Sequence, residues 1–359
     1  MFEHLDDPRP PALGAGLRRR VARGAQRRRR RRTAGGVGAV IVASVAGTGG
    51  LYARALWPAR DIERVEVAGT DSVPHGRPVT VLLLGTDGRS GVGSHNFDTI
   101  VLARVDPGAG TASLLSLPRD LIVDVPGEGP AMINSPTDPA AVVAIVEEQI
   151  GIPVDHLAVV GLDGVRDMVD RMGGVDVRVP APVRDEASGL FLDRTGCVTL
   201  GGEQALALLR SRKLEVLGSD GSWHRDPLSD LGRVERQRQV LFGALAGLGA
   251  GGFAPGDLED DVRWLAAHVT VDADLSVAGM VELARAVVRL GPDDVSGATI
   301  PVVTSPLDPN RLALDAAAAP ATIAAFVAGD PLPPTPPVTP GAPGVAAPDD
   351  PFSTAIGTC

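Results

Sequence analysis

Residues 79–89 read VTVLLLGTDGR, and this stretch decides the fold. Its first six residues form a continuous apolar run, which is typical of a strand buried on both faces of a sheet. Gly85 is expected to end the strand, so that Asp87 and Arg89 follow it in a loop. Ligands of open α/β sheets bind beyond the carboxyl ends of the strands. The stretch therefore predicts a carboxylate and a guanidinium at the mouth of a site.

Further strand and helix patterns follow this first strand. Strands are expected at residues 99–105 and 111–117, joined as a hairpin by the turn-forming sequence DPGAG. The alternation that follows predicts an α/β fold, a three-layer α-β-α sandwich with a central mixed sheet. The later predicted elements are helix 140–150, strand 157–162, helix 164–172, strand 175–179, helices 202–210, 233–248, 258–269 and 277–290, and a strand near 298–303.

Charge is distributed unevenly along the 359 residues. Residues 1–32 hold eleven arginines and three acidic side chains, a net charge of +8, which leaves −18 for the rest of a chain whose total is −10. An acidic body argues against nucleic-acid binding, because neutralising phosphates requires a basic face. The six histidines show no HExxH spacing, and GxSxG and GxxxxGK[ST] motifs are absent, which disfavours zinc enzymes, α/β-hydrolases and P-loop nucleotidases.

The basic segment precedes residues 33–53, which carry no charged side chain. As a helix they would extend about 31 Å, close to the hydrocarbon thickness of a membrane. The flanking arginines favour a cytoplasmic N-terminus, one transmembrane helix and an extracytoplasmic remainder. A cleaved signal peptide is the alternative, but the basic segment is long for one. Nucleic-acid binding by the arginines is a weaker alternative, because their position beside an apolar span favours topology control.

The two cysteines, Cys197 and Cys359, lie far apart in the sequence. Outside the cytoplasm they would form a disulfide that pins the C-terminal tail to the domain, and two unpaired thiols are the alternative. The segment between Lys213 and Asp230 is expected to form either a mobile lid that contains Trp223 or a plain surface loop. The expected segments are a basic cytoplasmic segment (1–32), a transmembrane anchor (33–57), a polar stalk (58–78), a catalytic domain (79–250), a helical and β-stranded extension of that domain (251–330) and a Pro-rich tail (331–359).

Two aspartates mark the predicted site. Asp98 begins the strand that follows Asp87, so the pairing of these strands would bring both carboxylates together. Hard oxygen ligands of this kind suit Mg²⁺, which shares its remaining positions with waters and phosphate oxygens. Taken alone, two aspartates near loops are more often turn formers.

Basic side chains at the ends of other elements favour a ligand-binding site over simple turn formation by the two aspartates. Arg119 follows the third strand, Arg210 and Arg212 alternate along the chain, and Arg233 and Gln237 lie four residues apart on one helix face. A guanidinium group binds two phosphate oxygens at once and keeps its charge. Together these residues predict a pyrophosphate clamp.

At these positions the chain resembles the LytR-CpsA-Psr family, over roughly residues 79–245. The resemblance implies a phosphotransferase that moves a glycopolymer from a polyisoprenyl-pyrophosphate carrier to peptidoglycan, with the lipid in an apolar tunnel. The motifs that carry it, in the order of the family, are LLLGTDGR, FDTIVLARVDP, SLLSLPRD, INS, MGGVDV, TLGGEQALALLRSRK and DLGRVERQRQVL.

The resemblance also implies roles for individual residues. Asp87 and Asp98 would hold Mg²⁺, for which Mn²⁺ can substitute. The identity of a general base stays open, because a metal-bound carboxylate such as Asp98 is a poor one. The implied pyrophosphate ligands are Arg89, Arg119, Arg210, Arg212, Arg233 and Gln237, and the implied catalytic set is Asp98, Arg119, Arg212 and Arg233.

The chain departs from the family pattern at three places. Asn96 stands where members often carry Arg, Met132 stands where Lys is usual, and the region after Asn134 is shortened. The loss of two positive charges bears on the identity of the substrate more than on the reaction class. A pyrophosphohydrolase that uses water as the acceptor and a non-catalytic membrane-bound regulator or lipid-binding protein are the alternative functions.

Overall fold

The computed structural model describes most of the chain that follows the predicted anchor. No helix within the described ranges is long and apolar enough to cross a membrane. Residues 33–55 of the predicted anchor lie outside these ranges, as does most of the Pro-rich tail. The described residues are 56–70, 73, 76–86, 96–226, 230–249 and 258–333.

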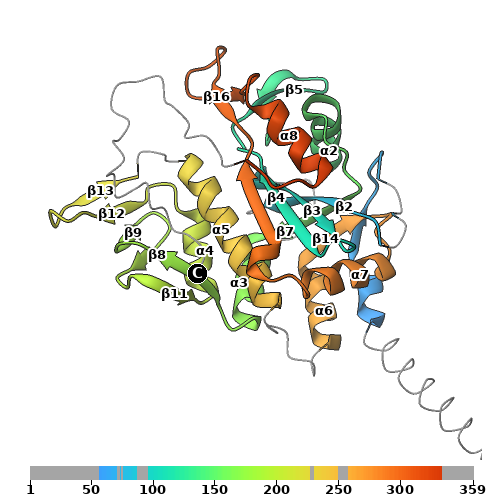
Figure 1. Cartoon of the computed structure of the whole chain (residues 1–359), viewed down its shortest axis with the longest axis horizontal. Coiled ribbons are helices and arrows are strands. Elements are labelled where there is room, and N and C mark those ends of the chain that lie inside the picture. Colours follow the sequence, from blue (N-terminus) through green and yellow to red (C-terminus); the bar gives the residue numbers. More distant parts are fainter. Residues whose placement is uncertain are drawn as a thin grey trace, which may run out of the picture. The chain divides into compact units, whose positions relative to one another are not determined.

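A seven-stranded sheet in the order β1-β14-β7-β2-β3-β4-β15 forms the centre of the fold (Figure 1). Strand β2 (Val79–Thr86) pairs antiparallel with β3 (Phe97–Asp106) and parallel with β7 (His156–Gly161), so the predicted mixed sheet is confirmed. The other strands of this sheet are β1 (Glu63–Val65), β4 (Thr111–Ser116), β14 (Val269–Asp272) and β15 (Val295–Thr299).

Helices cover both faces of this sheet. Leu82 and Ile100 belong to a core cluster that includes residues of α2 and α8, whereas Leu83 and Val101 lie on the opposite face with Leu241 of α5. Alternate residues of a strand point to opposite faces, so the near-continuous apolar runs supply both cores. The helices are α2 (Pro139–Ile145), α3 (Leu162–Arg171), α4 (Gly202–Arg210), α5 (Asp230–Gly249), α6 (Leu258–His268), α7 (Val277–Val287) and α8 (Ala319–Ala328).

Gly85 lies inside β2 rather than at its end. The strand continues to Thr86, and the register with β3 shifts between Gly85 and Thr86. A Cβ atom on Gly85 would lie 2.8 Å from Cβ of Thr99, closer than side-chain atoms approach one another. Glycine therefore permits the close contact between β2 and the beginning of β3, where Asp98 stands.

The segment predicted as a stalk is part of the fold. Strand β1 pairs in parallel with β14, and the Arg64 guanidinium donates a hydrogen bond of 2.8 Å to the carbonyl oxygen of Leu275. The sequence pattern missed this strand because its three residues, ERV, are mostly polar and exposed. Strands β14 and β15 come from the predicted extension 251–330, so the described part of that extension completes the same central sheet.

Two further predicted elements differ in detail. The helix predicted at 140–150 begins at Pro139 and changes at Val146 into a π-helical turn, η2 (Val146–Ile150), which Gly151 ends with a φ of 80°. The strand predicted near 298–303 is split, because β15 ends at Thr299 and β16 begins only at Val302.

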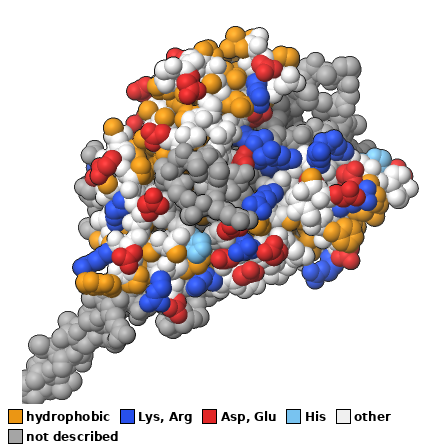
Figure 2. All heavy atoms as spheres, turned by 180° about the vertical axis from the view of Figure 1, so that it is seen from behind, with side chains coloured by type: hydrophobic (Ala, Val, Ile, Leu, Met, Phe, Trp, Pro, Cys, Tyr) orange, Lys and Arg blue, Asp and Glu red, His pale blue; other side chains and the backbone are white. Residues whose placement is uncertain are grey.

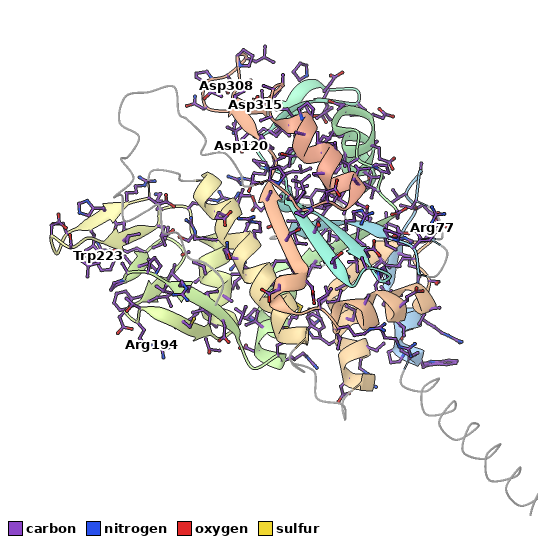
Figure 3. All side chains as sticks on the ribbon, viewed as in Figure 1. Arg77, Asp120, Arg194, Trp223, Asp308 and Asp315 are labelled. Atoms are coloured by element: carbon purple, nitrogen blue, oxygen red, sulfur yellow. The ribbon has the colours of Figure 1, made fainter. Side chains whose placement is uncertain are left out.

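A smaller sheet in the order β10-β9-β12-β13 was not predicted, and it bears on the segment between Lys213 and Asp230. The described part of that segment contains β12 and β13, so the plain surface loop is wrong, and a lid motion stays a prediction. Arg184 fixes it to β9 through a 2.6 Å ion pair with Glu215 and by lying 4.3 Å from the ring centroid of Trp223, which Figure 3 labels. The strands are β9 (Val183–Asp185), β10 (Leu190–Leu192), β12 (Glu215–Leu217) and β13 (Trp223–Arg225).

Three two-stranded ladders complete the described fold. The pair β8 and β11 packs with the smaller sheet and α4 in one apolar cluster, whereas β5 and Leu312 of β17 contribute to the main core. The ladders are β5 (Ile122–Val125) with β6 (Gly129–Met132), β8 (Val175–Val179) with β11 (Gly196–Leu200), and β16 (Val302–Thr304) with β17 (Leu312–Leu314).

Candidate functional site

Three arginines from distant parts of the chain converge on Asp98. Arg119 Nη1 lies 2.5 Å from Asp98 Oδ1, Arg212 Nη2 lies 3.2 Å from the same oxygen, and Arg233 Nη1 lies 3.6 Å from it. Arg212 Nη2 also lies 3.3 Å from Asp98 Oδ2. Figure 2 shows one face of the molecule, on which Lys and Arg side chains lie among Asp and Glu side chains. The structure thus brings together four residues that the sequence assigned to one site.

Secondary structure explains how each member reaches this point. Asp98 stands at the beginning of β3, and Arg119 follows the end of the neighbouring β4. The backbone next to Arg119 is held, because the Leu312 N–H donates to the carbonyl oxygen of Asp120, which Figure 3 labels. Arg233 lies in the first turns of α5.

The three guanidinium groups differ in exposure. The side chain of Arg233 is 2% exposed, that of Arg119 is 23% exposed and that of Arg212 is 48% exposed. A buried charge is tolerated only when it is paired, so Arg233 is a fixed element of the site and Asp98 is one of its partners. Arg212 retains the solvent access that a side chain needs to turn toward a ligand.

A cavity of about 430 Å³ adjoins this cluster. Its walls include Asp98, Arg212 and Arg233 together with Arg210 and Gln237, so five predicted site residues line it. Arg119 reaches it through its contact with Asp98, and the amide of Gln237 donates to the carbonyl oxygen of Leu209 at 3.4 Å. The predicted residues Asp87 and Arg89 lie outside the described residues.

Two polar lining residues were missed by sequence reasoning. Lys213 adds an exposed ammonium group next to Arg212, and Ser188 adds a hydroxyl from the turn between β9 and β10. The signal for Lys213 was its place in the RSRK run, whereas Ser188 has no motif and comes near α4 only through the smaller sheet.

Asp185 holds the segment that carries Arg212, and it was also missed. It is 1% exposed and accepts hydrogen bonds from Ser211 Oγ (2.8 Å), Lys213 N–H (2.7 Å) and Ala187 N–H (2.9 Å). Burial by itself would raise the pKa of the Asp185 carboxyl, but the hydrogen bonds, that of the Lys213 N–H foremost, bring the pKa below its ordinary value. The two donors from Ser211 and Lys213 flank Arg212, so Asp185 fixes the backbone at this arginine.

A buried ion pair supports the same segment from α5. Arg236 Nη1 lies 2.6 Å from Asp226 Oδ2, and Arg236 Nη2 donates a 2.9 Å hydrogen bond to the carbonyl oxygen of Ser211. Helix α4 ends just before Ser211, which has an extended backbone and is completely buried. The conformation at Arg212 is therefore determined by side chains from β9 and α5, on both sides of the chain.

The donors for a divalent cation are present only in part. Within the described residues no group of three or more His, Cys, Asp or Glu side chains lies close enough together to hold a metal ion. Asp98 is a hard anionic oxygen donor in the lining of the cavity, and this fits the role of one Mg²⁺ ligand beside phosphate oxygens and water. The second predicted ligand, Asp87, lies outside the described residues.

Cys197, for which the sequence predicts a disulfide, and His156 complete the description of polar side chains in the fold. Cys197 is disulfide-bonded, whereas Cys359 lies outside the described residues, so their pairing stays a prediction. His156 is buried as a packing residue would be, but its Nδ1 lies 3.2 Å from Oδ1 of the completely buried Asp272. It is thus part of a buried polar pair that joins β7 to β14.

The fold and the site define a class: an α/β protein with a mixed central sheet and an arginine-rich cavity suited to a phosphorylated ligand. The family model described as the LytR_cpsA_psr family matches residues 58–318. The chain therefore belongs to the LytR-CpsA-Psr family. The match begins at residue 58, in agreement with the finding that the predicted stalk is part of the fold.

Curated relatives agree with this family. The chain is 31% identical over 256 residues to the probable cell wall biosynthesis protein LcpB of Corynebacterium glutamicum, a match that covers 66% of this chain and 57% of that protein. It is 33% identical over 172 residues to the polyisoprenyl-teichoic acid–peptidoglycan teichoic acid transferase TagU of Enterococcus faecalis, covering 46% of this chain and 52% of that one. The chain thus spans little more than half the length of these relatives.

Solved structures share the fold. The LytR-Csp2A-Psr enzyme from Actinomyces oris superposes with a TM-score of 0.62 at 26% identity, over 74% of this chain and 95% of that one. The TagV protein of B. subtilis superposes with a TM-score of 0.56 at 22% identity, over 73% of this chain and 100% of that one. The second likeness bears on the fold alone.

Proposed function

We propose that this chain transfers a glycopolymer from a polyisoprenyl-pyrophosphate carrier to peptidoglycan. Family membership supports the proposal, as do relatives whose names describe cell wall biosynthesis and the transfer of teichoic acid from a polyisoprenyl carrier to peptidoglycan. The observation that carries it is the convergence of Arg119, Arg212 and Arg233 on Asp98 beside a cavity of about 430 Å³. Three permanent cations around a single carboxylate leave positive charge for an anionic ligand.

Pyrophosphate is the anion that this arrangement suits. Guanidinium groups bind two oxygens at once, and Arg210, Lys213 and the Gln237 amide add further donors to the same cavity. In the structure described here the arginines contact Asp98, and a bound pyrophosphate would take over part of those contacts. Arg212 is the member most able to move, because almost half of its side chain is exposed.

The proposed reaction is an attack by a hydroxyl of the wall acceptor on the phosphorus next to the glycan. A new phosphorus–oxygen bond forms to the acceptor, the pyrophosphate bond breaks, and the lipid leaves as its monophosphate with the bridging oxygen and the bonding electron pair. The proton of the acceptor hydroxyl is released to the departing phosphate or to solvent. Little covalent chemistry is needed from the protein, so positioning and electrostatic stabilisation of the charge on the transferring phosphoryl group dominate the catalysis. Arg119, Arg212 and Arg233 would supply that stabilisation.

Mg²⁺ and the location at the membrane are part of the same proposal. Asp98 and Asp87 would hold the ion, which when bound would neutralise charge on the pyrophosphate. The uncharged residues 33–53 behind an arginine-rich segment would anchor the chain by one helix, with the catalytic domain outside the cytoplasm.

A transfer assay tests the proposed function. The full-length chain in detergent is incubated with a lipid-linked pyrophosphoryl oligosaccharide labelled in the sugar, with Mg²⁺ and with purified peptidoglycan. We expect the label to become attached to peptidoglycan while lipid monophosphate is released, and the Arg212→Ala variant to lose most of this transfer. Release of free sugar phosphate without labelled peptidoglycan would contradict the proposal and identify a hydrolase. Absence of both products would leave a binding protein or regulator.

A further inference from the structure

A second cavity, of about 350 Å³, adjoins the arginine cluster, and the proposed function does not use it. One wall comes from the turn and strand β10 at residues 188–191, and the other comes from helix α4. Arg210 and Ser188 line both this cavity and the cavity that contains Asp98. A ligand held by the arginines therefore has a direct neighbouring space in which to continue.

The chemistry of this second cavity differs from that of the first. Its polar side chains include the carboxylate of Glu203, the amide of Gln204 and the hydroxyl of Ser188, and Arg210 is the one cation among its described lining residues. A second phosphate group would meet a carboxylate there. A hydrocarbon chain would leave these polar groups without partners, which is costly. The lining thus favours an uncharged ligand with many hydroxyl groups.

An exposed aromatic ring forms part of the same wall. Phe191 is 60% exposed, while its neighbours Leu190 and Leu192 on β10 are each 3% exposed. The outward position of a half-buried strand is normally polar, whereas here it carries an aromatic ring, in a chain with only seven phenylalanines. Because most of this ring is exposed, packing in the core does not explain its presence. An apolar ring face beside carboxylate and amide groups can pack on the C–H face of a pyranose while the polar groups bind its hydroxyls.

Glu203 is available for such hydrogen bonds. Its side chain is 80% exposed, and it lies 3.6 Å from Arg166 Nη1, a guanidinium group that makes a shorter contact of 2.8 Å with Asp167. The cavity volume falls in the lower part of the range of roughly 300–1,000 Å³ that small-ligand sites occupy. The volume of the cavity, its polar lining and its place beside the arginine cluster therefore all favour a small, uncharged ligand with many hydroxyl groups.

We propose that the cavity between β10 and α4 is a saccharide subsite, in which Phe191 packs on an uncharged pyranose ring and Glu203 and Gln204 bind its hydroxyls. The inference rests on the proposed function, because the arginine cluster next to it would hold the pyrophosphate. The pyranose belongs either to the glycan of the lipid-linked donor, next to the pyrophosphate, or to the glycan strand of the acceptor. These two sources share the same recognition chemistry.

Three probes distinguish the sources when they are titrated into the full-length chain in detergent. Farnesyl pyrophosphate tests the arginine cluster without a sugar, farnesyl-pyrophosphoryl N-acetylglucosamine adds one donor sugar, and a phosphate-free chito-oligosaccharide represents the acceptor. The variants are Phe191→Ala, Phe191→Trp and Glu203→Gln. The matched controls are Leu307→Ala, at another exposed apolar side chain, and Asp193→Asn, at an exposed carboxylate.

We expect Phe191→Ala to weaken a sugar-bearing probe roughly 3- to 10-fold, the range typical of one aromatic contact, and to leave farnesyl pyrophosphate binding unchanged. Phe191→Trp should retain the affinity, and Glu203→Gln should weaken the same probe without affecting farnesyl pyrophosphate. Loss confined to the pyrophosphoryl sugar would assign the subsite to the donor, and loss confined to the chito-oligosaccharide would assign it to the acceptor. Both results support the proposal.

Other results would overturn it. Equal weakening of farnesyl pyrophosphate and its sugar derivative would mean that Phe191 contacts the lipid, and unchanged binding of every probe would mean that it contacts no ligand. Failure of the wild-type chain to bind any sugar-bearing probe would also exclude the subsite. If the wild-type chain binds a sugar-bearing probe but not farnesyl pyrophosphate, the result counts against the proposed function. The comparison of wild type and Phe191→Ala for chito-oligosaccharide binding then still tests the subsite.

Discussion

Asp185→Asn should destabilise the protein and disturb Arg212 at the same time. In the wild type one carboxylate oxygen accepts from Ser211 Oγ and the Lys213 N–H, and the other accepts from the Ala187 N–H. An asparagine has only one acceptor oxygen, so its NH₂ group must face at least one of these donors. The best orientation keeps the two bonds next to Arg212 and leaves the Ala187 N–H unpaired.

The magnitude follows from these contacts. The Ala187 N–H is only part-buried, so leaving it unpaired costs about 1 kcal/mol, and two hydrogen bonds that change from a charged to a neutral acceptor lose about 1 kcal/mol each. The expected loss is therefore about 3 kcal/mol in the free energy of unfolding. For a domain of this size that corresponds to a decrease in Tm of roughly 6–12 °C. Asp193→Asn, an exposed change on the neighbouring loop, should change the stability by less than about 0.5 kcal/mol.

The effect should also depend on pH in a defined direction. The pKa of the Asp185 carboxyl lies below its ordinary value of 3.8 in the folded protein, because hydrogen bonds, that of the Lys213 N–H foremost, outweigh the opposing effect of burial. A group with a lowered pKa stabilises the fold above its unfolded-state pKa, and this contribution is lost as the pH falls through the folded-state pKa. Thermal unfolding of wild type and variant at pH 7, 5 and 3 measures this. Equal Tm values at pH 7, or a difference at pH 3 as large as at pH 7, would refute the assigned role of Asp185.

Three further changes test other parts of the structure. Arg212→Ala should reduce the rate of glycopolymer transfer roughly 10²- to 10³-fold, the usual cost of one electrostatic contact in a transition state. The Tm should not change, because the side chain is half-exposed. A transfer rate near that of the wild type would contradict the role of Arg212. Asp272→Asn should lower the free energy of unfolding by about 2–4 kcal/mol, because the buried carboxylate accepts from His156 and from the Leu157 and Leu275 N–H groups. Burial by itself would raise the pKa of Asp272, but the His156 hydrogen bond and backbone N–H groups lower it below its ordinary value of 3.8. The difference in the free energy of urea unfolding between wild type and variant should therefore be present at pH 7 and be lost as the pH falls below 3.8. Gly85→Ala would place a Cβ 2.8 Å from that of Thr99, so the beginning of β3, where Asp98 stands, must shift. We expect a loss of about 1–3 kcal/mol in the free energy of urea unfolding together with weaker transfer, and wild-type stability would show that β3 shifts without cost.

The central sheet could be predicted from the sequence because its strands are long and apolar. Runs such as residues 79–84 identify a strand by themselves, since each is buried from both sides. Strands of three residues do not contain a readable period, so the smaller sheet and β1 were missed. Trp223 illustrates the difficulty, because its segment looks polar and irregular. Its place in a sheet comes from the backbone pairing of β13 with β12 and of β12 with β9, together with the contacts of Arg184 with Trp223 and Glu215.

The candidate site was predictable to the extent that motifs name its charged residues. Arg119, Arg212 and Arg233 were assigned through the family resemblance and the suitability of guanidinium groups for phosphate, and the structure places all three at Asp98. Asp185 was not predictable in this way. Its sequence neighbourhood contains several acidic residues, and only the folded backbone shows which of them accepts hydrogen bonds from both sides of Arg212.

The site combines rigid and adaptable parts, and the difference follows from where each arginine is attached. Arg233 is buried on α5, behind the carboxylate of Asp98, so its position is fixed before a ligand arrives. Arg212 is exposed, but its backbone is held by Asp185 from β9 and by Arg236 from α5. A side chain that moves on a fixed backbone can leave Asp98 for a phosphate oxygen without the cost of ordering a loop. The smaller sheet would therefore contribute to the proposed phosphate binding although Arg212 itself lies outside its strands, because the sheet limits the freedom of the segment that carries this arginine.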